Sequence, residues 1–136
     1  MVEILKVSNL STAFQSSYGS KQALKNISFK INEGEVLALV GESGSGKTVT
    51  SLSIMGLLPN NAYVEEGNIN LTDKKNNQIN ILELTDEKHN LIRGNDISMV
   101  FQEPMTCLNP TMTVGDQIIE VILNHKKLLK MKLLKK

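Results

Sequence analysis

Alternating apolar and polar residues predict two antiparallel strand pairs. The first pair covers Ile4 to Phe14 and Gln22 to Ile31, with Gln15 to Lys21 as a polar loop between them. The second covers Asn68 to Leu71 and Ile79 to Leu82, joined by a turn rich in Asn, Asp and Lys. A period of two is typical of strands that bury one face. These segments predict an antiparallel β subdomain formed by residues 1–35 and 67–84.

Two further apolar segments have strand length but a different pattern. Val36 to Val40 is a continuous apolar run, which is expected of a parallel strand with both faces covered by helices. Ile97 to Phe101 is a second short strand candidate. Asn60 to Glu66 is predicted to be a polar connection after Pro59.

Three segments have features of helices. Apolar residues recur at intervals of three after position 48, at Val49, Leu52, Met55 and Leu58, and Pro59 stops this segment after about three turns. Thr85 is suited to cap a short helix through Arg93, which Gly94 breaks. Thr113 to Asp116 resembles a capping box, so a third helix is expected to start at about Val114.

Between the first apolar strand and the first helix lies a stretch that fits the pattern G-x-x-x-x-G-K-[ST]. Its glycines allow backbone angles and close approaches that a Cβ would block, so successive N–H groups can turn toward an anion. Lys47 is expected to reach the β- and γ-phosphates, and the Thr48 hydroxyl to ligate a bridging Mg²⁺. A chance match is the alternative, but the strand and the helix stand where a phosphate loop requires them. The predicted nucleotide-binding residues here are Gly41, Glu42, Ser43, Gly44, Ser45, Gly46, Lys47, Thr48 and Val49.

Charge and length limit the possible functions. The 136 residues are at most one domain, with a formal charge of +1. Six of the fifteen basic residues lie at positions 126–136, so residues 1–124 hold nine basic and fourteen acidic residues, a net charge of −5. This body gives no electrostatic reason to expect nucleic acid as a partner. No apolar run reaches the roughly 18 residues of a membrane span, and the start lacks a signal-peptide pattern, so we expect a cytosolic chain.

The phosphate loop and a second stretch together carry a family resemblance. The run GESGSGKTVT at positions 41–50 and the run FQEPMTCLNP at positions 101–110, preceded by Arg93-Gly94, resemble the ATP-binding subunit of an ABC transporter of the dipeptide/oligopeptide importer type. The resemblance covers about residues 3–125. It implies the N-terminal half of an α/β P-loop NTPase core with an antiparallel β subdomain. It also implies that residues 126–136 are a separate Lys/Leu-rich tail, from a truncated or frame-shifted reading frame.

The resemblance also implies roles for individual residues. Gln102 matches the family glutamine that helps to ligate Mg²⁺ and senses the γ-phosphate, while its loop touches the membrane subunit. Phe14 matches the aromatic that stacks on adenine, with Tyr18 as the competing candidate; a plain core position is the alternative for Phe14. Cys107 is read as a small packed side chain. ATP and Mg²⁺ are the implied ligands, with Thr48 and Gln102 as the metal-binding residues.

Several parts that the family needs for hydrolysis are absent from these residues. The sequence contains no apolar strand ending in Asp-Glu, no Leu-Ser-Gly-Gly-Gln signature and no later switch histidine. We therefore assign no catalytic residue and expect this chain to hold phosphates without turning ATP over. We also expect Val36 to Val40 and Ile97 to Phe101 to show uncovered apolar faces and to make the isolated chain prone to aggregation.

The resemblance implies that the complete protein binds and hydrolyses MgATP to power peptide import. Its partners would be membrane subunits and a second ATP-binding subunit, at the cytoplasmic face of the cell membrane. Three alternatives stay open: a nucleotide-binding module without hydrolysis, a membrane-surface role of the basic amphipathic tail, and a different phosphate-loop enzyme such as a GTPase or small kinase.

Overall fold

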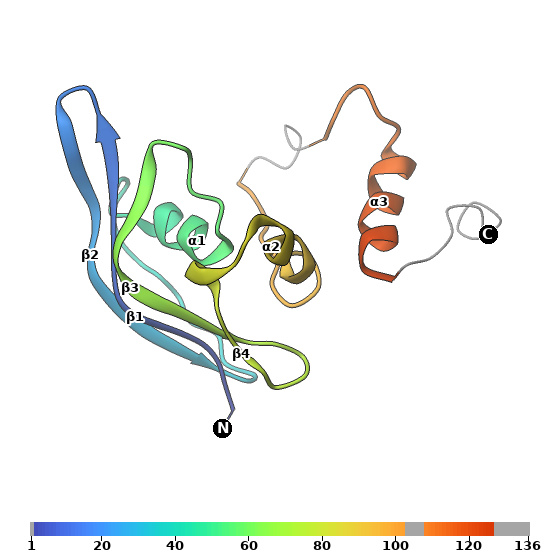
Figure 1. The fold of residues 1–136 in the computed structure, drawn as a ribbon, viewed down its shortest axis with the longest axis horizontal. Helices are drawn as coiled ribbons and strands as arrows, with labels where there is room; N and C mark the ends of the chain where they lie inside the picture. Colours follow the sequence, from blue (N-terminus) through green and yellow to red (C-terminus); the bar gives the residue numbers. More distant parts are fainter. Residues whose placement is uncertain (1, 103–107, 127–136) are drawn as a thin grey trace. The chain divides into compact units, whose positions relative to one another are not determined.

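The computed structural model describes residues 2–102 and 108–126, which divide into two compact units, residues 1–89 and 90–136. The first unit holds four strands and helix α1, and the second holds helix α3 (Figure 1). Helix α2 crosses the boundary between them. The elements are β1 (Glu3–Ser16), β2 (Gly19–Asn32), α1 (Lys47–Met55), β3 (Ala62–Thr72), β4 (Gln78–Asn80), a 3₁₀ turn (Ile81–Glu83), α2 (Asp86–Ile92) and α3 (Val114–Lys126).

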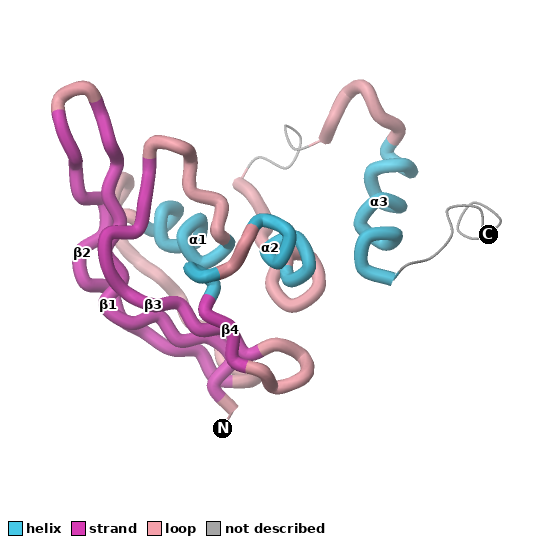
Figure 2. Tube along the Cα trace, in the orientation of Figure 1, coloured by secondary structure: helices cyan, strands magenta, loops and turns pink. Residues whose placement is uncertain are grey.

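The four strands form one antiparallel sheet in the order β2-β1-β3-β4 (Figure 2). The long hairpin β1–β2 closes in a tight turn, where the Ser16 hydroxyl donates to the Gly19 carbonyl at 2.8 Å. Strand β3 pairs with the other edge of β1, and β4 pairs with β3. The antiparallel β subdomain predicted from the alternating pattern is therefore confirmed.

Apolar residues of the sheet, helix α1 and the 3₁₀ turn form the buried core of the first unit. β1 contributes the largest share of it, because this strand lies between β2 and β3. The least exposed of these residues are Val7, Leu10, Ala13, Leu24, Ile69 and Ile81.

Gly67 marks the closest approach of β1 and β3. A Cβ on this residue would lie 2.7 Å from Leu10 Cα and 2.7 Å from the Ser8 carbonyl oxygen. The register of β1 against β3 shifts between Ser8 and Ser11, and Asn9 has a positive φ of 51°. A bulge of this kind increases the local twist of the sheet, and the missing side chain of Gly67 makes room for it.

Two sequence predictions near β3 are wrong. Residues 60–66 are not a polar connection, because β3 begins at Ala62 and its first residues pair with Phe14 and Ala13 of β1. The strand predicted through Leu82 ends at Asn80, whose side chain accepts from the Leu82 N–H at 3.2 Å and starts a 3₁₀ turn. The Asn80 side chain thus accepts a backbone N–H that would otherwise be available to continue the strand pairing.

The two predicted strands outside the antiparallel sheet do not form. Residues 36–40 and 98–101 have no strand assignment, and only an isolated bridge joins Arg93 to Ile97. Val36 and Val40 are each 94% exposed and Val100 is 92% exposed. An extended segment becomes a strand only when neighbours accept its hydrogen bonds, and no described residue pairs with residues 36–40. The uncovered apolar faces expected from the sequence are therefore observed.

Helix α1 is shorter than predicted and buries a different face. It ends at Met55, where Gly56 caps it in a left-handed conformation with φ of 62°. Its buried residues are Thr50, Ser53 and Met55, whereas Val49 and Leu52 are only half-buried. The prediction failed because hydroxyl side chains can bond within the helix and so tolerate burial.

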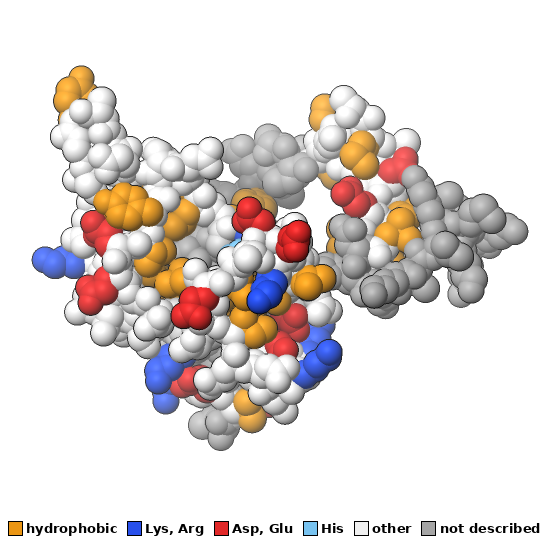
Figure 3. Space-filling view, in the orientation of Figure 1, with side chains coloured by type: hydrophobic (Ala, Val, Ile, Leu, Met, Phe, Trp, Pro, Cys, Tyr) orange, Lys and Arg blue, Asp and Glu red, His pale blue; other side chains and the backbone are white. Residues whose placement is uncertain are grey.

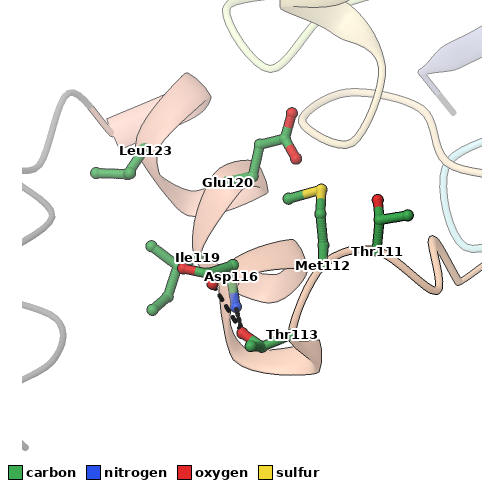
Figure 4. Close-up of a pocket in the computed structure, with 7 residues that line it drawn as sticks. All are labelled: Thr111, Met112, Thr113, Asp116, Ile119, Glu120 and Leu123. Atoms are coloured by element: carbon green, nitrogen blue, oxygen red, sulfur yellow. Dashed lines mark hydrogen bonds between the residues drawn. The ribbon is translucent and has the colours of Figure 1, made fainter.

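Helix α3 starts at the predicted residue. The Thr113 hydroxyl accepts from the Asp116 N–H at 3.1 Å and donates to the Asp116 carboxylate at 2.8 Å, which confirms the capping arrangement (Figure 4). In the described ranges no helix has the length and apolar character needed to cross a membrane. The Lys/Leu-rich tail lies outside the described residues after Lys126.

Candidate functional site: a glycine-rich loop at the start of helix α1

The loop at positions 41–48 runs directly into α1. The Ser45 N–H donates to the Glu42 carbonyl at 3.2 Å, which closes a turn. Gly44 and Gly46 have positive φ angles of 81° and 92°, which residues with a Cβ rarely adopt. The spacing of these glycines therefore produces the local backbone shape that the motif predicts.

Lys47 folds back over the loop that precedes it. Its ammonium donates to the carbonyl oxygens of Gly41 at 2.7 Å and Glu42 at 2.6 Å. It also donates to the Ser45 hydroxyl at 3.2 Å. All three acceptors are loop oxygens, so the positive charge of Lys47 is held against the loop.

The loop has no spare volume for side chains at two glycines. A Cβ on Gly41 would lie 2.6 Å from the Ser45 hydroxyl oxygen, and a Cβ on Gly46 would overlap side chain and backbone of β2. Contacts below 3.0 Å require atoms to move. The glycines therefore let the loop pack closely against its own Ser45 and against β2.

The start of α1 carries donors without acceptors. In the described part of the chain, none of the backbone N–H groups of Gly44, Gly46, Lys47, Thr48 and Val49 has a hydrogen-bond acceptor. Gly46, at the cap position, makes no side-chain capping bond, and the first turn holds no acidic residue. Free N–H groups and the positive end of the helix dipole favour an anion at this point.

Thr50 anchors the loop to the helix, a contact that the sequence analysis did not identify. Its N–H donates to the Gly46 carbonyl at 2.8 Å and its hydroxyl donates to the same oxygen at 3.0 Å. Thr50 is only 2% exposed, so its hydroxyl depends on this bond to satisfy its donor. In the sequence, the feature that could have indicated this contact is a hydroxyl residue three positions after the motif lysine.

The two aromatic candidates for base stacking lie on the β1–β2 hairpin. Phe14 is half-buried and pairs with Lys21 and Ala62 on the neighbouring strands. Tyr18 is 100% exposed in the hairpin turn, so both faces of its ring are accessible. The structure leaves the base-stacking role of Phe14 a prediction.

The predicted metal-binding residues lie in different units. Thr48 is exposed in the first turn of α1, and no described residue bonds to its hydroxyl. Gln102 is exposed and belongs to the second unit. The described residues contain no group of three or more His, Cys, Asp or Glu side chains suited to a metal ion. Cys107 and the run 103–107 lie outside the described residues.

The second unit has its own cavity, which none of the loop residues line. It is an open cavity of about 550 Å³ beside the first turns of α3, lined in part by Met112, Ile119 and Leu123 (Figure 4). The Thr113–Asp116 capping pair lies at its edge. Its lining combines three apolar side chains with two threonines and two acidic side chains, Asp116 and Glu120, and includes no lysine or arginine to attract a phosphate.

A model of the ABC transporter family matches residues 24–135 of the chain, which include the glycine-rich loop and α1. The chain belongs to the ABC transporter family. The family match covers both units and therefore confirms the resemblance inferred from the two sequence runs.

Curated relatives are ATP-binding proteins of peptide transport. The chain is 50% identical over 131 residues to the dipeptide transport ATP-binding protein DppD of Bacillus subtilis, covering 96% of the chain and 38% of that protein. It is 46% identical over 125 residues to DppD of Lactococcus lactis, covering 92% and 34%. It is 46% identical to the oligopeptide transport ATP-binding protein AppD of Bacillus subtilis, covering 96% and 38%. The chain thus spans little more than a third of these relatives.

A solved structure shows the same fold. MJ0796, described as a bacterial ABC transporter cassette in a dimeric structure, matches with a TM-score of 0.71 and 24% identity. The match covers 97% of this chain and 53% of that chain. The structure is therefore an N-terminal portion of the ABC ATPase fold: part of the P-loop core and its antiparallel β subdomain.

Proposed function

We propose that this chain binds MgATP through residues 41–49. The observation that carries the proposal is the set of unbonded N–H groups at the start of α1, together with the Lys47 ammonium, which bonds to carbonyls of the same loop. A triphosphate offers the oxygens that these donors lack, and its charge suits both Lys47 and the helix N-terminus. On binding, the Lys47 ammonium exchanges loop carbonyls for phosphate oxygens.

Mg²⁺ would be held by the Thr48 hydroxyl, the Gln102 side-chain amide oxygen and the nucleotide. Both side chains supply hard oxygen ligands, which this ion prefers. Bound Mg²⁺ supplies charge neutralisation between the phosphates; Thr48 and Gln102 only hold and orient it.

Isothermal titration calorimetry with MgATP tests this proposal. We expect the wild-type chain to bind and Lys47→Ala to lose at least tenfold in affinity, since a bond to a charged group contributes about 1.5–3 kcal/mol. Lys30→Ala is the matched control, because it also removes a lysine, at an exposed position of β2 outside residues 41–49. Equal binding by wild type and Lys47→Ala would refute the proposal.

For the base, we propose that Phe14 stacks on adenine, and Tyr18 is the alternative. A ring on this hairpin would add about 1–3 kcal/mol by stacking. Tyr18 is fully exposed in the hairpin turn and Phe14 is half-buried beside β2 and β3, so each ring has surface available for stacking. Comparison of Phe14→Leu with Tyr18→Leu decides between them: the stacking ring is the one whose loss weakens ATP binding but not tripolyphosphate binding.

In the whole protein, we propose that ATP binding and hydrolysis power peptide import. The support is the 46–50% identity to dipeptide and oligopeptide transport ATP-binding proteins. Residues 1–125 would be the N-terminal part of the ATP-binding domain, followed by the tail 126–136. The protein would bind membrane subunits and a second ATP-binding subunit at the cytoplasmic face of the cell membrane. Loss of labelled dipeptide uptake after Lys47→Ala substitution in the chromosomal gene tests this role, and unchanged uptake would contradict it.

A further inference from the structure

A buried hydroxyl chain connects β1 to the first turn of α1. The Ser53 hydroxyl donates to the Val49 carbonyl at 2.8 Å, and Thr12 Oγ1 lies 3.3 Å from Ser53 Oγ. A carbonyl only accepts, so Ser53 uses its single hydrogen there. Thr12 must therefore be the donor to Ser53, and the chain runs in one direction from β1 to Val49.

Both hydroxyl groups of this hydrogen-bonded link are buried. Thr12 is 0% exposed and Ser53 is 1% exposed, so water cannot replace either partner. A buried hydroxyl without a hydrogen-bond partner lowers the stability of the fold, because its desolvation is not compensated. The link holds residues 41 positions apart in sequence in one fixed arrangement.

The two ends of the link lie next to different parts of the proposed nucleotide site. Val49 is in the first turn of α1, whose N–H groups without acceptors form the proposed phosphate subsite. Thr12 is on β1, two residues before Phe14, and the same hairpin carries Tyr18. Both base-stacking candidates thus belong to the hairpin that Thr12 joins to the phosphate-binding helix.

We propose that Thr12 and Ser53 are positioning residues for nucleotide binding: they fix the distance between the base subsite on the β1–β2 hairpin and the phosphate subsite at α1. This inference rests on the proposed function. A ligand that contacts both subsites gains from their fixed separation, because the second contact is then made without a further ordering cost. A ligand that contacts only the phosphate subsite gains nothing from the link.

Two probes separate these cases, MgATP and inorganic tripolyphosphate with Mg²⁺, each titrated into the 136-residue chain. Thr12→Val and Ser53→Ala are each expected to weaken MgATP binding by roughly 3- to 10-fold, the factor that corresponds to one hydrogen bond. Tripolyphosphate affinity is expected to stay within about twofold, because the loop bonds of Lys47 and Thr50 do not involve these residues. Thr12→Ser, which keeps the hydroxyl, is expected to restore MgATP affinity.

Ser51→Ala is the matched control. The Ser51 hydroxyl donates to the Lys47 carbonyl at 3.3 Å, the same bond within α1, but it makes no bond to β1. It should leave the ratio of MgATP to tripolyphosphate affinity unchanged. A thermal melt of each variant identifies any loss of folded protein, and Thr12→Ser, which loses the buried methyl group but keeps the hydroxyl, shows whether lower stability alone weakens MgATP binding.

The outcomes distinguish the inference from the proposed function. If the wild-type chain binds neither probe, both fail. If it binds MgATP, and Thr12→Val and Ser53→Ala keep the wild-type ratio or weaken both probes equally, only the positioning inference is overturned. A change in the ratio that Ser51→Ala reproduces overturns it as well.

Discussion

The Leu24 side chain of β2 fills the space that a side chain on Gly46 would need. A Cβ on Gly46 would lie 2.5 Å from Leu24 Cδ2 and 3.2 Å from the Ala23 carbonyl oxygen. Leu24 is 2% exposed and pairs with Thr12 on β1, so it cannot move into solvent. The glycine that ends the loop is thus required both by its backbone angle and by its contact with the sheet.

We expect Gly46→Ala to destabilise the fold by about 2–4 kcal/mol, from the positive φ and the overlap with Leu24 together. Gly44→Ala is the control, because Gly44 has a similar φ of 81° but nothing within 4 Å of its built Cβ. Gly44→Ala should lower the free energy of unfolding only by the cost of a positive φ for alanine, about 1–2 kcal/mol. Urea denaturation measures both, and equal costs would show that the Leu24 contact has no energetic effect.

We expect Lys47→Met to loosen the empty loop. The ammonium bonds to two loop carbonyls, and methionine keeps the chain length without any donor. Amides of residues 42–45 should then exchange with deuterium several-fold faster without nucleotide, because the Ser45 turn loses its support. Lys47→Arg keeps the charge and should change exchange less. Identical exchange in all three proteins would mean that the lysine does not order the empty loop.

Residues 36–40 are expected to pair with a second copy of the chain in solution. The run Val-Leu-Ala-Leu-Val reads the same in both directions, so an antiparallel pair centred on Ala38 places Val36 opposite Val40. A parallel pair in register would instead oppose Glu35 with Glu35 and Glu42 with Glu42, which like charges disfavour. Edges without partners and with exposed apolar side chains recruit other chains.

Cysteine cross-linking measures this pairing in a Cys107→Ser background. Ala38→Cys should form a disulfide-linked dimer, and a mixture of Val36→Cys and Val40→Cys chains should cross-link with each other. Val36→Cys alone should not, since its two copies would lie several residues apart. Efficient cross-linking of Val36→Cys alone would indicate parallel pairing, and a monodisperse monomer would contradict the expectation altogether.

The turn between β3 and β4 should lose stability at low pH. The Asp73 carboxylate accepts from the Asn77 side chain at 2.9 Å and from the N–H groups of Asn77 and Lys75, each at 2.8 Å. These bonds, with Asn77 first, lower the pKa of Asp73 below its usual value of 3.8. A carboxyl group whose pKa is lower in the folded than in the unfolded state stabilises the fold at pH values above its unfolded-state pKa. This contribution disappears as the pH falls through the folded-state pKa.

Titration of the Asp73 carboxyl carbon by NMR measures this pKa. Asn77→Ala should raise the pKa of Asp73 toward its usual value, and Lys75→Ala should raise it less, because the charge of Lys75 is the smallest of the causes. A larger effect of Lys75→Ala would show that charge rather than hydrogen bonding controls the group.

Local patterns predicted the parts of the fold that local interactions determine. The β1–β2 hairpin followed from alternation, and the Thr113 cap followed from residues three positions apart. The prediction of a strand at residues 36–40 was wrong. An apolar run indicates which side chains a segment can bury, but it does not show whether a neighbouring strand is present to pair with it. The contacts of Gly46 with Leu24 and of Thr12 with Ser53 join distant positions, which no local pattern reveals.

The most direct test of the account is to follow the backbone amides of residues 44–49 by ¹H–¹⁵N NMR while MgATP is added. These are the residues whose N–H groups, apart from that of Ser45, have no acceptor in the described part of the chain. If this loop binds the phosphates, the amides of Gly44, Gly46, Lys47, Thr48 and Val49 will shift and become protected from exchange, and Lys47→Ala will abolish the change. Binding of MgATP that leaves these amides unshifted, with changes elsewhere in the chain, would contradict it.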